Sequence, residues 1–262
     1  MTLQSLTSGL NLATALGAAI HKNLDTIPPA ENCHERKELY ADFFRQVGMT
    51  ENLVLAEQGS LMGCSSQGNN LTGRASICML PGLFDLDKDA YGFILKHEAG
   101  HIIANDLITM PMAGIISIIA GTYFSNKNRC GFLAHYLFLN IISLLSMAAV
   151  SQWREAKADD FAIKHSTHQE LIGGARFFEG IKSMTEGGLN IDFLHPSLSS
   201  RIQKIRNELV RRGVSNFTES NQFMYKYRLT NLVSSSQTEG LEKLQRKLLA
   251  VQSFFMNFFP TK

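Results

Sequence analysis

The pentapeptide His97-Glu98-Ala99-Gly100-His101 has the residue types and the spacing best suited to chemistry in this chain. Residues four apart lie on the same face of an α-helix, so both imidazoles can reach one metal ion. Glu98 directly follows the first histidine, close enough to handle the proton of a water molecule on that ion. The pattern therefore predicts a zinc site with a carboxylate beside it. The alternative is a helix whose two histidines are merely packed.

The flanking sequence favours a helix around this pentapeptide. Asp87 or Asp89 supplies an N-cap. Gly100 costs about 1 kcal/mol relative to Ala in a helix interior, so we expect another backbone to pack closely against it. Apolar residues and the two histidines recur at helical spacing and predict a stripe that faces the core rather than water: Ala90, Ile94, His97, His101, Ala104 and Ile108.

A catalytic zinc ion keeps three protein ligands and an open position for water, so a third ligand is required. The best candidate is Glu155, in the charged segment 153–161. Glu155 and Asp159 are four residues apart and share one helical face. One of them can bind the metal while the other accepts a hydrogen bond from a ligand imidazole. The alternative is a solvated helix end, which is the usual role of such charge clusters.

Three separated motifs resemble those of the gluzincin metalloendopeptidases that include HtpX and the type I CAAX prenyl protease. The first is H-E-x-x-H at 97–101, followed by the polar pair Asn105-Asp106. The second is E-x-x-A-D from Glu155 to Asp159, and the third is H-P-x-x-x-x-R-I at 195–202. The resemblance covers about residues 61–207, more than half of the chain.

The resemblance implies a role for each matching residue. It implies one Zn²⁺ per chain, held by three side chains: His97, His101 and Glu155. Glu98 would be the general base, and Asp159 would contact a ligand histidine. His195 would stabilise the oxyanion that forms from the substrate carbonyl, although the residues alone favour an ordinary helix boundary before proline. Arg201 would pin the late segment against the active-site helices, through Asp159 or Glu155.

One departure from the family concerns the substrate strand. Family members usually carry an Asn-Ala-rich strand before the first motif, and the corresponding stretch 61–70 has no clear match. The segment Arg74 to Leu80 predicts a short strand. As an edge strand it could take an extended protein or peptide substrate by strand addition.

Two uncharged runs follow the first motif. Residues 107–124 form a run of 18, residues 130–153 form a run of 24, and the polar turn 125–129 separates them. Each run is long enough for a transmembrane helix. Because the ligands on either side of the pair must meet at one ion, the chain must cross an even number of times. We therefore expect membrane association through a hairpin at 107–153. The alternative is a soluble cytoplasmic protein in which the hairpin is a buried helix pair.

The orientation of such a hairpin stays open from the sequence. Lys127 and Arg129 favour a cytoplasmic turn, whereas Arg154 and Lys157 favour the reverse. The N-terminal apolar stretch 10–20 has no Lys or Arg before it, so no signal peptide is predicted.

Length and composition predict one catalytic domain with extensions. The chain has 262 residues and is 45% hydrophobic, enough for a sizeable core. We expect N-terminal helices at 1–50, a metallopeptidase domain at 51–212, and a linker with an amphipathic helix at 213–262. The expected class is mainly α (α+β), a helical zinc metallopeptidase domain with a small edge sheet and a central apolar helical hairpin.

Other features exclude several function classes. The four cysteines have neither disulfide-framework nor C-x-x-C spacing, and no nucleic-acid-binding motif accompanies the net charge of +2. The sequence gives no indication of oligomeric state. It predicts a zinc-dependent metalloendopeptidase with Glu98 as general base. The alternatives are a catalytically idle membrane scaffold, or an interaction module in which a structural zinc has four protein ligands.

Overall fold

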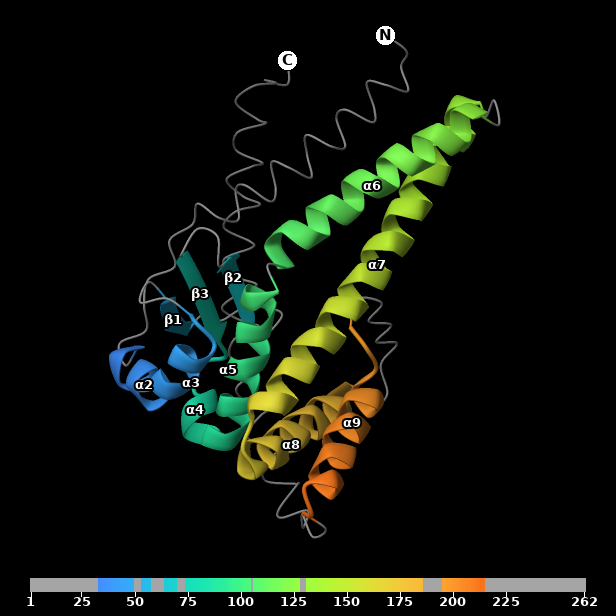
Figure 1. Ribbon diagram of the computed structural model, residues 1–262. Helices are drawn as coiled ribbons and strands as arrows, with labels where there is room; N and C mark the ends of the chain where they lie inside the picture. The colour runs from blue at the N-terminus through green and yellow to red at the C-terminus, as the bar shows by residue number, and fades with distance from the viewer. Residues whose placement is uncertain are drawn as a thin grey trace, which may run out of the picture.

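The computed structural model describes residues 33–49, 53–57, 64–69, 74–104, 106–127, 131–185 and 195–214. Helices dominate this part of the chain and a small sheet lies at one side (Figure 1), which confirms the mainly α class. Of the N-terminal helices predicted at 1–50, the part before residue 33 lies outside the described residues, as does the amphipathic C-terminal helix. The division into three segments at 50 and 212 stays a prediction.

The sheet has three strands: β1 (Leu53–Glu57), β2 (Ser65–Asn69) and β3 (Arg74–Met79). Their order is β1-β3-β2, with β1 parallel and β2 antiparallel to β3. The prediction that the Arg74 segment forms an edge strand is therefore wrong, because β3 is the central strand. Its partner β2 reads SSQGN, which lacks the β-branched and aromatic residues typical of strands. Among the described strands, β2 forms the edge that packs on α5.

Helices α2 (Cys33–Leu39) and α3 (Ala41–Gln46) precede the sheet, and the short α4 (Leu83–Leu86) follows it. Helix α5 (Lys88–Ile103) carries the H-E-x-x-H motif. Asp87 caps α5, with its Oδ1 accepting hydrogen bonds from the amides of Asp89 and Ala90 at 3.1 and 3.0 Å. This geometry decides between the two predicted caps.

Helix α5 is surrounded by protein on every side. All residues from Ala90 to Ile102 are buried, because α7 and α8 pack against the helix in addition to β2, β3 and α4. The histidines face the interior, as predicted, but the helix has no opposite face in water. The expected apolar stripe therefore accounts for only part of the buried surface of α5.

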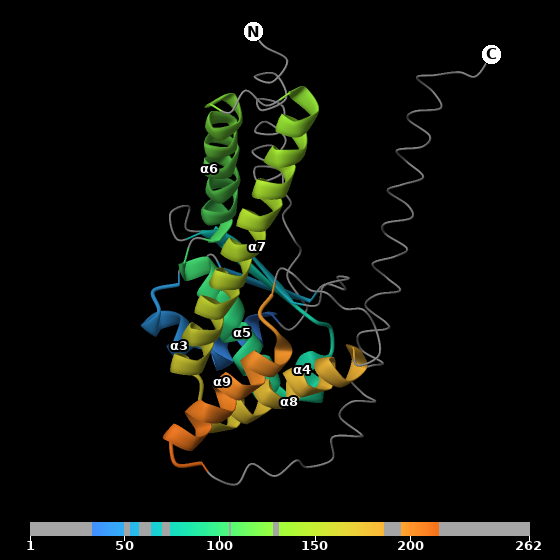
Figure 2. The same cartoon turned by 90° about the vertical axis from the view of Figure 1, so that its right-hand side faces the viewer.

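Helices α6 (Asp106–Lys127) and α7 (Phe132–His165) form the predicted hairpin. Figures 1 and 2 show α6 and the first half of α7 projecting side by side away from the body. The second half of α7 returns into the body and packs on α5. A Cβ at Gly100 would lie 3.1 Å from Ala158 Cα of α7, which confirms the expected close approach of a second backbone.

The last helices complete the body. Helix α8 (His168–Thr185) packs against α5, and α9 (Leu198–Arg211) packs against α8 and α7. The hydrophobic core extends from α3 and the sheet through α5 to these helices, with Phe93, Leu171 and Ile205 almost inaccessible to water. The core therefore holds α5 and the second half of α7 side by side.

Candidate metal centre

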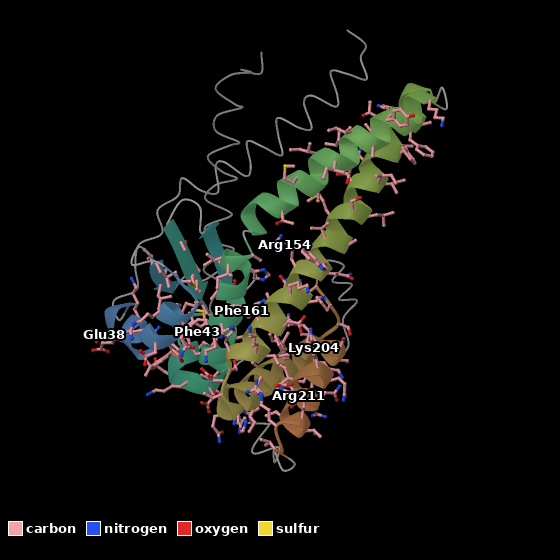
Figure 3. All side chains as sticks on the ribbon, viewed as in Figure 1. Glu38, Phe43, Arg154, Phe161, Lys204 and Arg211 are labelled. Carbon is pink, nitrogen blue, oxygen red and sulfur yellow. The ribbon has the colours of Figure 1, made fainter. Side chains whose placement is uncertain are left out.

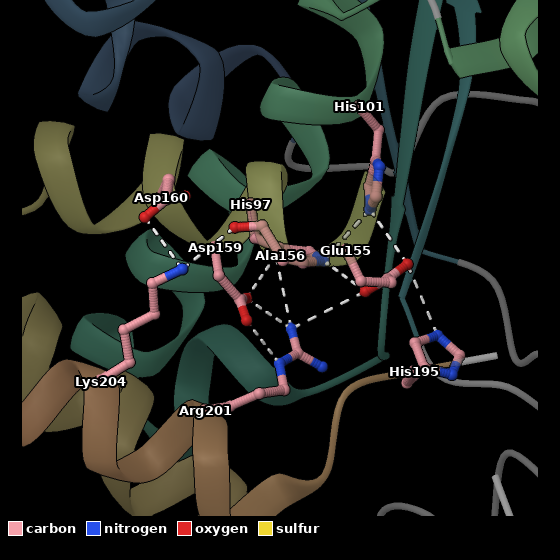
Figure 4. A network of polar contacts seen from close by, with 9 residues as sticks. All are labelled: His97, His101, Glu155, Ala156, Asp159, Asp160, His195, Arg201 and Lys204. Atoms are coloured by element: carbon pink, nitrogen blue, oxygen red, sulfur yellow. Dashed lines mark hydrogen bonds and ion pairs between the residues drawn. The ribbon is translucent and has the colours of Figure 1, made fainter. Parts of the chain in front are cut away.

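Three of the predicted residues converge between α5 and α7 (Figure 4). The Nε2 atoms of His97 and His101 lie 3.2 Å apart. Glu155 straddles them, with one carboxylate oxygen 3.3 Å from His97 Nε2 and the other 3.3 Å from His101 Nε2. The helical spacing of four and the close packing of α7 on α5 produce this meeting of residues more than fifty positions apart.

The chemistry and spacing of these donors fit a zinc ion. Zinc prefers imidazole nitrogen and carboxylate oxygen at about 2.0–2.2 Å in a tetrahedral arrangement, which separates neighbouring donors by about 3.3 Å. One donor atom from each of the three residues lies within 4.8 Å of the others. Within the described ranges, the group that could hold an ion consists of these three side chains, which leaves room for a fourth, non-protein ligand.

Asp159 orients the first imidazole. Its Oδ1 lies 3.0 Å from His97 Nδ1. Since an ionised carboxylate only accepts hydrogen bonds, Nδ1 carries a proton, and Nε2 is the nitrogen that would present its lone pair to a bound metal ion. Glu155 thus faces the Nε2 atoms and Asp159 faces Nδ1, which are the positions that the two tasks foreseen for the segment require.

Arg201 on α9 holds Asp159 from the other side. Its Nη2 and Nε donate to the two oxygens of Asp159 at 2.6 and 2.8 Å, a bidentate pair that fixes the carboxylate in direction as well as position. The guanidinium also lies 4.1 Å from the ring centre of Phe178. The distance from Nη2 to Glu155 is 3.8 Å, so Asp159 is the principal partner of Arg201.

The contacts at the site keep both carboxylates ionised. Burial alone would raise the pKa of Glu155, but hydrogen bonds from His101 and His97 hold it well below its usual range. Burial also opposes ionisation of Asp159, and the hydrogen bond from His97 together with the charges of His97 and Arg201 lowers its pKa. Burial disfavours a charged His97, whereas hydrogen bonds to Asp159 and Glu155 raise its pKa. Glu155 is therefore an anion at neutral pH, as a metal ligand requires.

Glu98 has the thiol of Cys64 as a neighbour. Glu98 is buried on α5. Cys64, which directly precedes β2, accepts a hydrogen bond from the Leu80 amide at 3.4 Å. Burial, followed by the negative charge of Glu98, raises the pKa of the Cys64 thiol to about 12. The thiol is therefore protonated at neutral pH, where only a thiolate binds zinc.

His195 reaches the site from the segment before α9. Its Nε2 lies 3.5 Å from Glu155 Oε1, and its side chain is about one-third exposed. All seven predicted residues therefore lie in or beside one cluster. The oxyanion role of His195 stays a prediction, as do the roles of the other six.

Sequence reasoning missed a buried ion pair behind this cluster. Lys96, next to the first histidine, contacts Glu170 at the start of α8. The T-x-x-E pattern of Thr167 to Glu170 is a capping-box signal that predicts the start of α8. No sequence signal links that box to Lys96.

Comparison with known proteins gives a match to the part of the chain that contains the cluster. A family model described as peptidase family M48 matches residues 47–209, a range that includes every residue of the cluster. The comparisons with curated proteins and with solved structures gave no match.

Proposed function

The chain belongs to peptidase family M48, and on this premise we propose that it is a zinc-dependent metalloendopeptidase with Glu98 as its general base. The family supports a peptidase, and the group of His97, His101 and Glu155 supports a bound metal. The observation that carries the proposal is this three-residue group with a glutamate between its two histidines in sequence. A structural zinc would require a fourth protein ligand.

The residues of the site suit hydrolysis of a peptide bond. When bound, Zn²⁺ supplies an acidified water and polarises the carbonyl that is attacked. Glu98 takes the proton of the attacking water and returns it to the leaving amine. His195 donates a hydrogen bond to the carbonyl oxygen as negative charge develops there. Asp159, held by Arg201, keeps the His97 imidazole in the tautomer that presents Nε2.

An extended protein or peptide is the substrate that the fold favours. Helix α5 packs against β2, whose second edge has no partner among the described strands. A peptide that adds to this edge would pass along the helix that carries Glu98, with main-chain hydrogen bonds giving affinity. This assignment moves the proposed substrate edge from β3 to β2.

The α6–α7 hairpin supports membrane association. A small residue lies at the contact between the two helices, where a Cβ at Gly121 would lie 2.5 Å from Leu139, and Ser117 of α6 is also buried. Large apolar side chains point outward instead: Met112, Ile116, Ile119, Tyr123, Phe124, Leu137, Ile141, Leu144, Leu145 and Met147. Small residues inside and large apolar residues outside are the arrangement of helices packed in lipid.

Helix length agrees with this arrangement for α7 but not for α6. By length and composition, α7 contains a stretch within residues 137–165 that is able to cross a membrane, and the apolar part of α6, 112–124, is shorter. The sticks in Figure 3 project outward along the hairpin, where a buried helix pair would be covered by other elements. We therefore propose that the hairpin, rather than the body, contacts the bilayer.

The decisive test of the enzymatic proposal is Glu98→Gln. This change removes the proton acceptor and keeps all three proposed ligands, so about one zinc per chain should stay bound while peptide cleavage is lost. Glu38→Gln, an equal change at an exposed residue of α2 far from the site (Figure 3), is the control. Cleavage at the wild-type rate by the Glu98→Gln protein would remove Glu98 from the mechanism.

A further inference from the structure

A buried ion pair lies behind the metal centre and takes no part in the proposed chemistry. The Nζ of Lys96 donates to the two oxygens of Glu170 at 2.6 and 2.5 Å. The two side chains are 6% and 11% exposed. A buried ion pair generally stabilises a fold no better than well-packed apolar residues do. A role in positioning other residues would explain the ion pair better than a contribution to stability.

The Glu170 end of the pair is fixed by two further contacts. Glu170 completes a capping box, in which its Oε2 accepts from the Thr167 amide at 2.7 Å and its own amide donates to Thr167 Oγ1 at 3.2 Å. Its carboxylate also fills the space left by a missing side chain, since a Cβ at Gly92 would lie 2.5 Å from Oε1. The carboxylate is thus confined against α5 at the first turn of α8.

The Lys96 end is confined as well. Its Nζ lies 5.4 Å from the ring centre of Phe43 on α3, and that ring lies 6.2 Å from the ring of Phe161 on α7. Figure 3 shows Phe43 and Phe161 in the middle of the body. Lys96 therefore projects into a space bounded by α3, α7 and the start of α8.

Helix α5 needs directional contacts because burial alone does not orient it. All of its sides are buried from Ala90 to Ile102, and hydrophobic burial is non-directional. At 3.6 residues per turn, Lys96 projects about 100° from His97 and about 140° from His101. The Lys96–Glu170 pair thus holds the helix from a direction away from the metal.

The pair also connects α5 to the corner between α7 and α8. Only Ser166 and Thr167 separate the end of α7 from the start of α8. We propose that Lys96 and Glu170 are positioning residues, which fix the rotation of α5 against the α7–α8 corner so that both histidines meet Glu155 at one ion. This inference rests on the proposed metal centre.

The test removes both charges together, so that neither is left unpaired. In Lys96→Met/Glu170→Met we expect zinc affinity, measured by chelator competition, to fall at least tenfold. We also expect the visible absorption bands of the cobalt(II)-substituted protein, which report metal geometry, to change. The thermal midpoint of the metal-free protein should fall only by the loss of the Thr167–Glu170 cap, because replacing a buried ion pair by an apolar pair is often neutral.

The control is Arg206→Met/Glu179→Met, which removes a more exposed ion pair between α9 and α8. Its zinc affinity and cobalt spectrum should equal those of wild type. If Lys96→Met/Glu170→Met does not fold, Gly92→Ala decides, because the added methyl displaces the Glu170 carboxylate and keeps the ion pair's charges.

Wild-type zinc affinity and an unchanged cobalt spectrum in the folded double variant, or in Gly92→Ala where that variant decides, would overturn the positioning role alone. A wild-type protein that binds no zinc would overturn the proposed function and, with it, this inference. The two failures are therefore distinguishable in one set of measurements.

Discussion

Helix α7 runs through two regions of the molecule that are built in opposite ways. In the body, its residues Glu155 and Asp159 are largely buried, and each has a defined polar partner. In the hairpin, exposed Ile141 and Leu144 have water or lipid as neighbours, whereas the tight contact with α6 falls on Gly121. Directional bonds orient the helices of the body, and close approach at small residues joins those of the hairpin. Changes in one region should therefore leave the other intact.

The largest effect is expected from Glu155→Ala in the body. Removal of the only proposed ligand from α7 should release the zinc and lower cleavage on the order of 10³-fold or more. Metal analysis after dialysis and a peptide-cleavage assay measure the two effects. Lys157→Ala, on the exposed face of the same helix, is the control. Unchanged zinc content in Glu155→Ala would mean that the third ligand is wrongly assigned.

Polar substitution of the hairpin is the complementary change. We expect the wild-type protein to remain in the membrane pellet after carbonate extraction. A variant with four lysines on the exposed apolar face should move to the supernatant, because each charge costs about 2.5–3.5 kcal/mol at the centre of a bilayer. The four positions are Ile116, Ile119, Ile141 and Leu144.

Zinc content of the lysine variant should equal that of wild type, since all three proposed ligands lie outside the hairpin. Lysines at the exposed body residues Leu39 and Val210 provide the control and should not change the pellet fraction. Wild-type protein in the supernatant would favour the soluble alternative.

Asp159→Asn should have an intermediate effect on the metal centre. The amide no longer provides a charged acceptor for His97 Nδ1 and Arg201, so zinc affinity should fall about 10–100-fold, as for other residues that orient a metal ligand. Chelator competition measures this change. Asp160→Asn is the matched control, because Asp160 is the next residue, is exposed, and pairs with Lys204 at 2.9 Å. Equal losses in both variants would contradict the orienting role.

The smallest effects should have opposite signs in the two regions. In the body, Gly100→Ala places a methyl 3.1 Å from Ala158 Cα. We expect a loss of about 1 kcal/mol or more, a fall in thermal midpoint of about 2–4 °C per kcal/mol. In the hairpin, a Cβ at Gly114 meets nothing within 4 Å. There, Gly114→Ala should raise the free energy of unfolding by about 0.5–1 kcal/mol, through helix propensity. A loss at both positions would contradict the difference in packing.

Local patterns were sufficient to predict the elements that carry the site. The spacing of His97 and His101, the cap at Asp87 and the small residue at Gly100 each report on one helix, and the structure shows all three features where expected. The hairpin was visible as two uncharged runs. Such features depend on neighbours in sequence, which is why sequence alone can reveal them.

Features that depend on partners far along the chain were not predictable. The central position of β3 follows from its pairing with β2, whose polar sequence gives no strand signal. The burial of α5 on every side follows from the packing of α7 and α8. Likewise, nothing near Lys96 in sequence indicates Glu170, 74 residues away.

The most direct test of the central claim is zinc K-edge X-ray absorption of the purified wild-type protein. A centre formed by His97, His101 and Glu155 predicts nitrogen and oxygen donors at about 2.0–2.2 Å, with the multiple-scattering signature of two imidazoles. A sulfur shell at about 2.3 Å, or a signal from one imidazole only, would contradict the account.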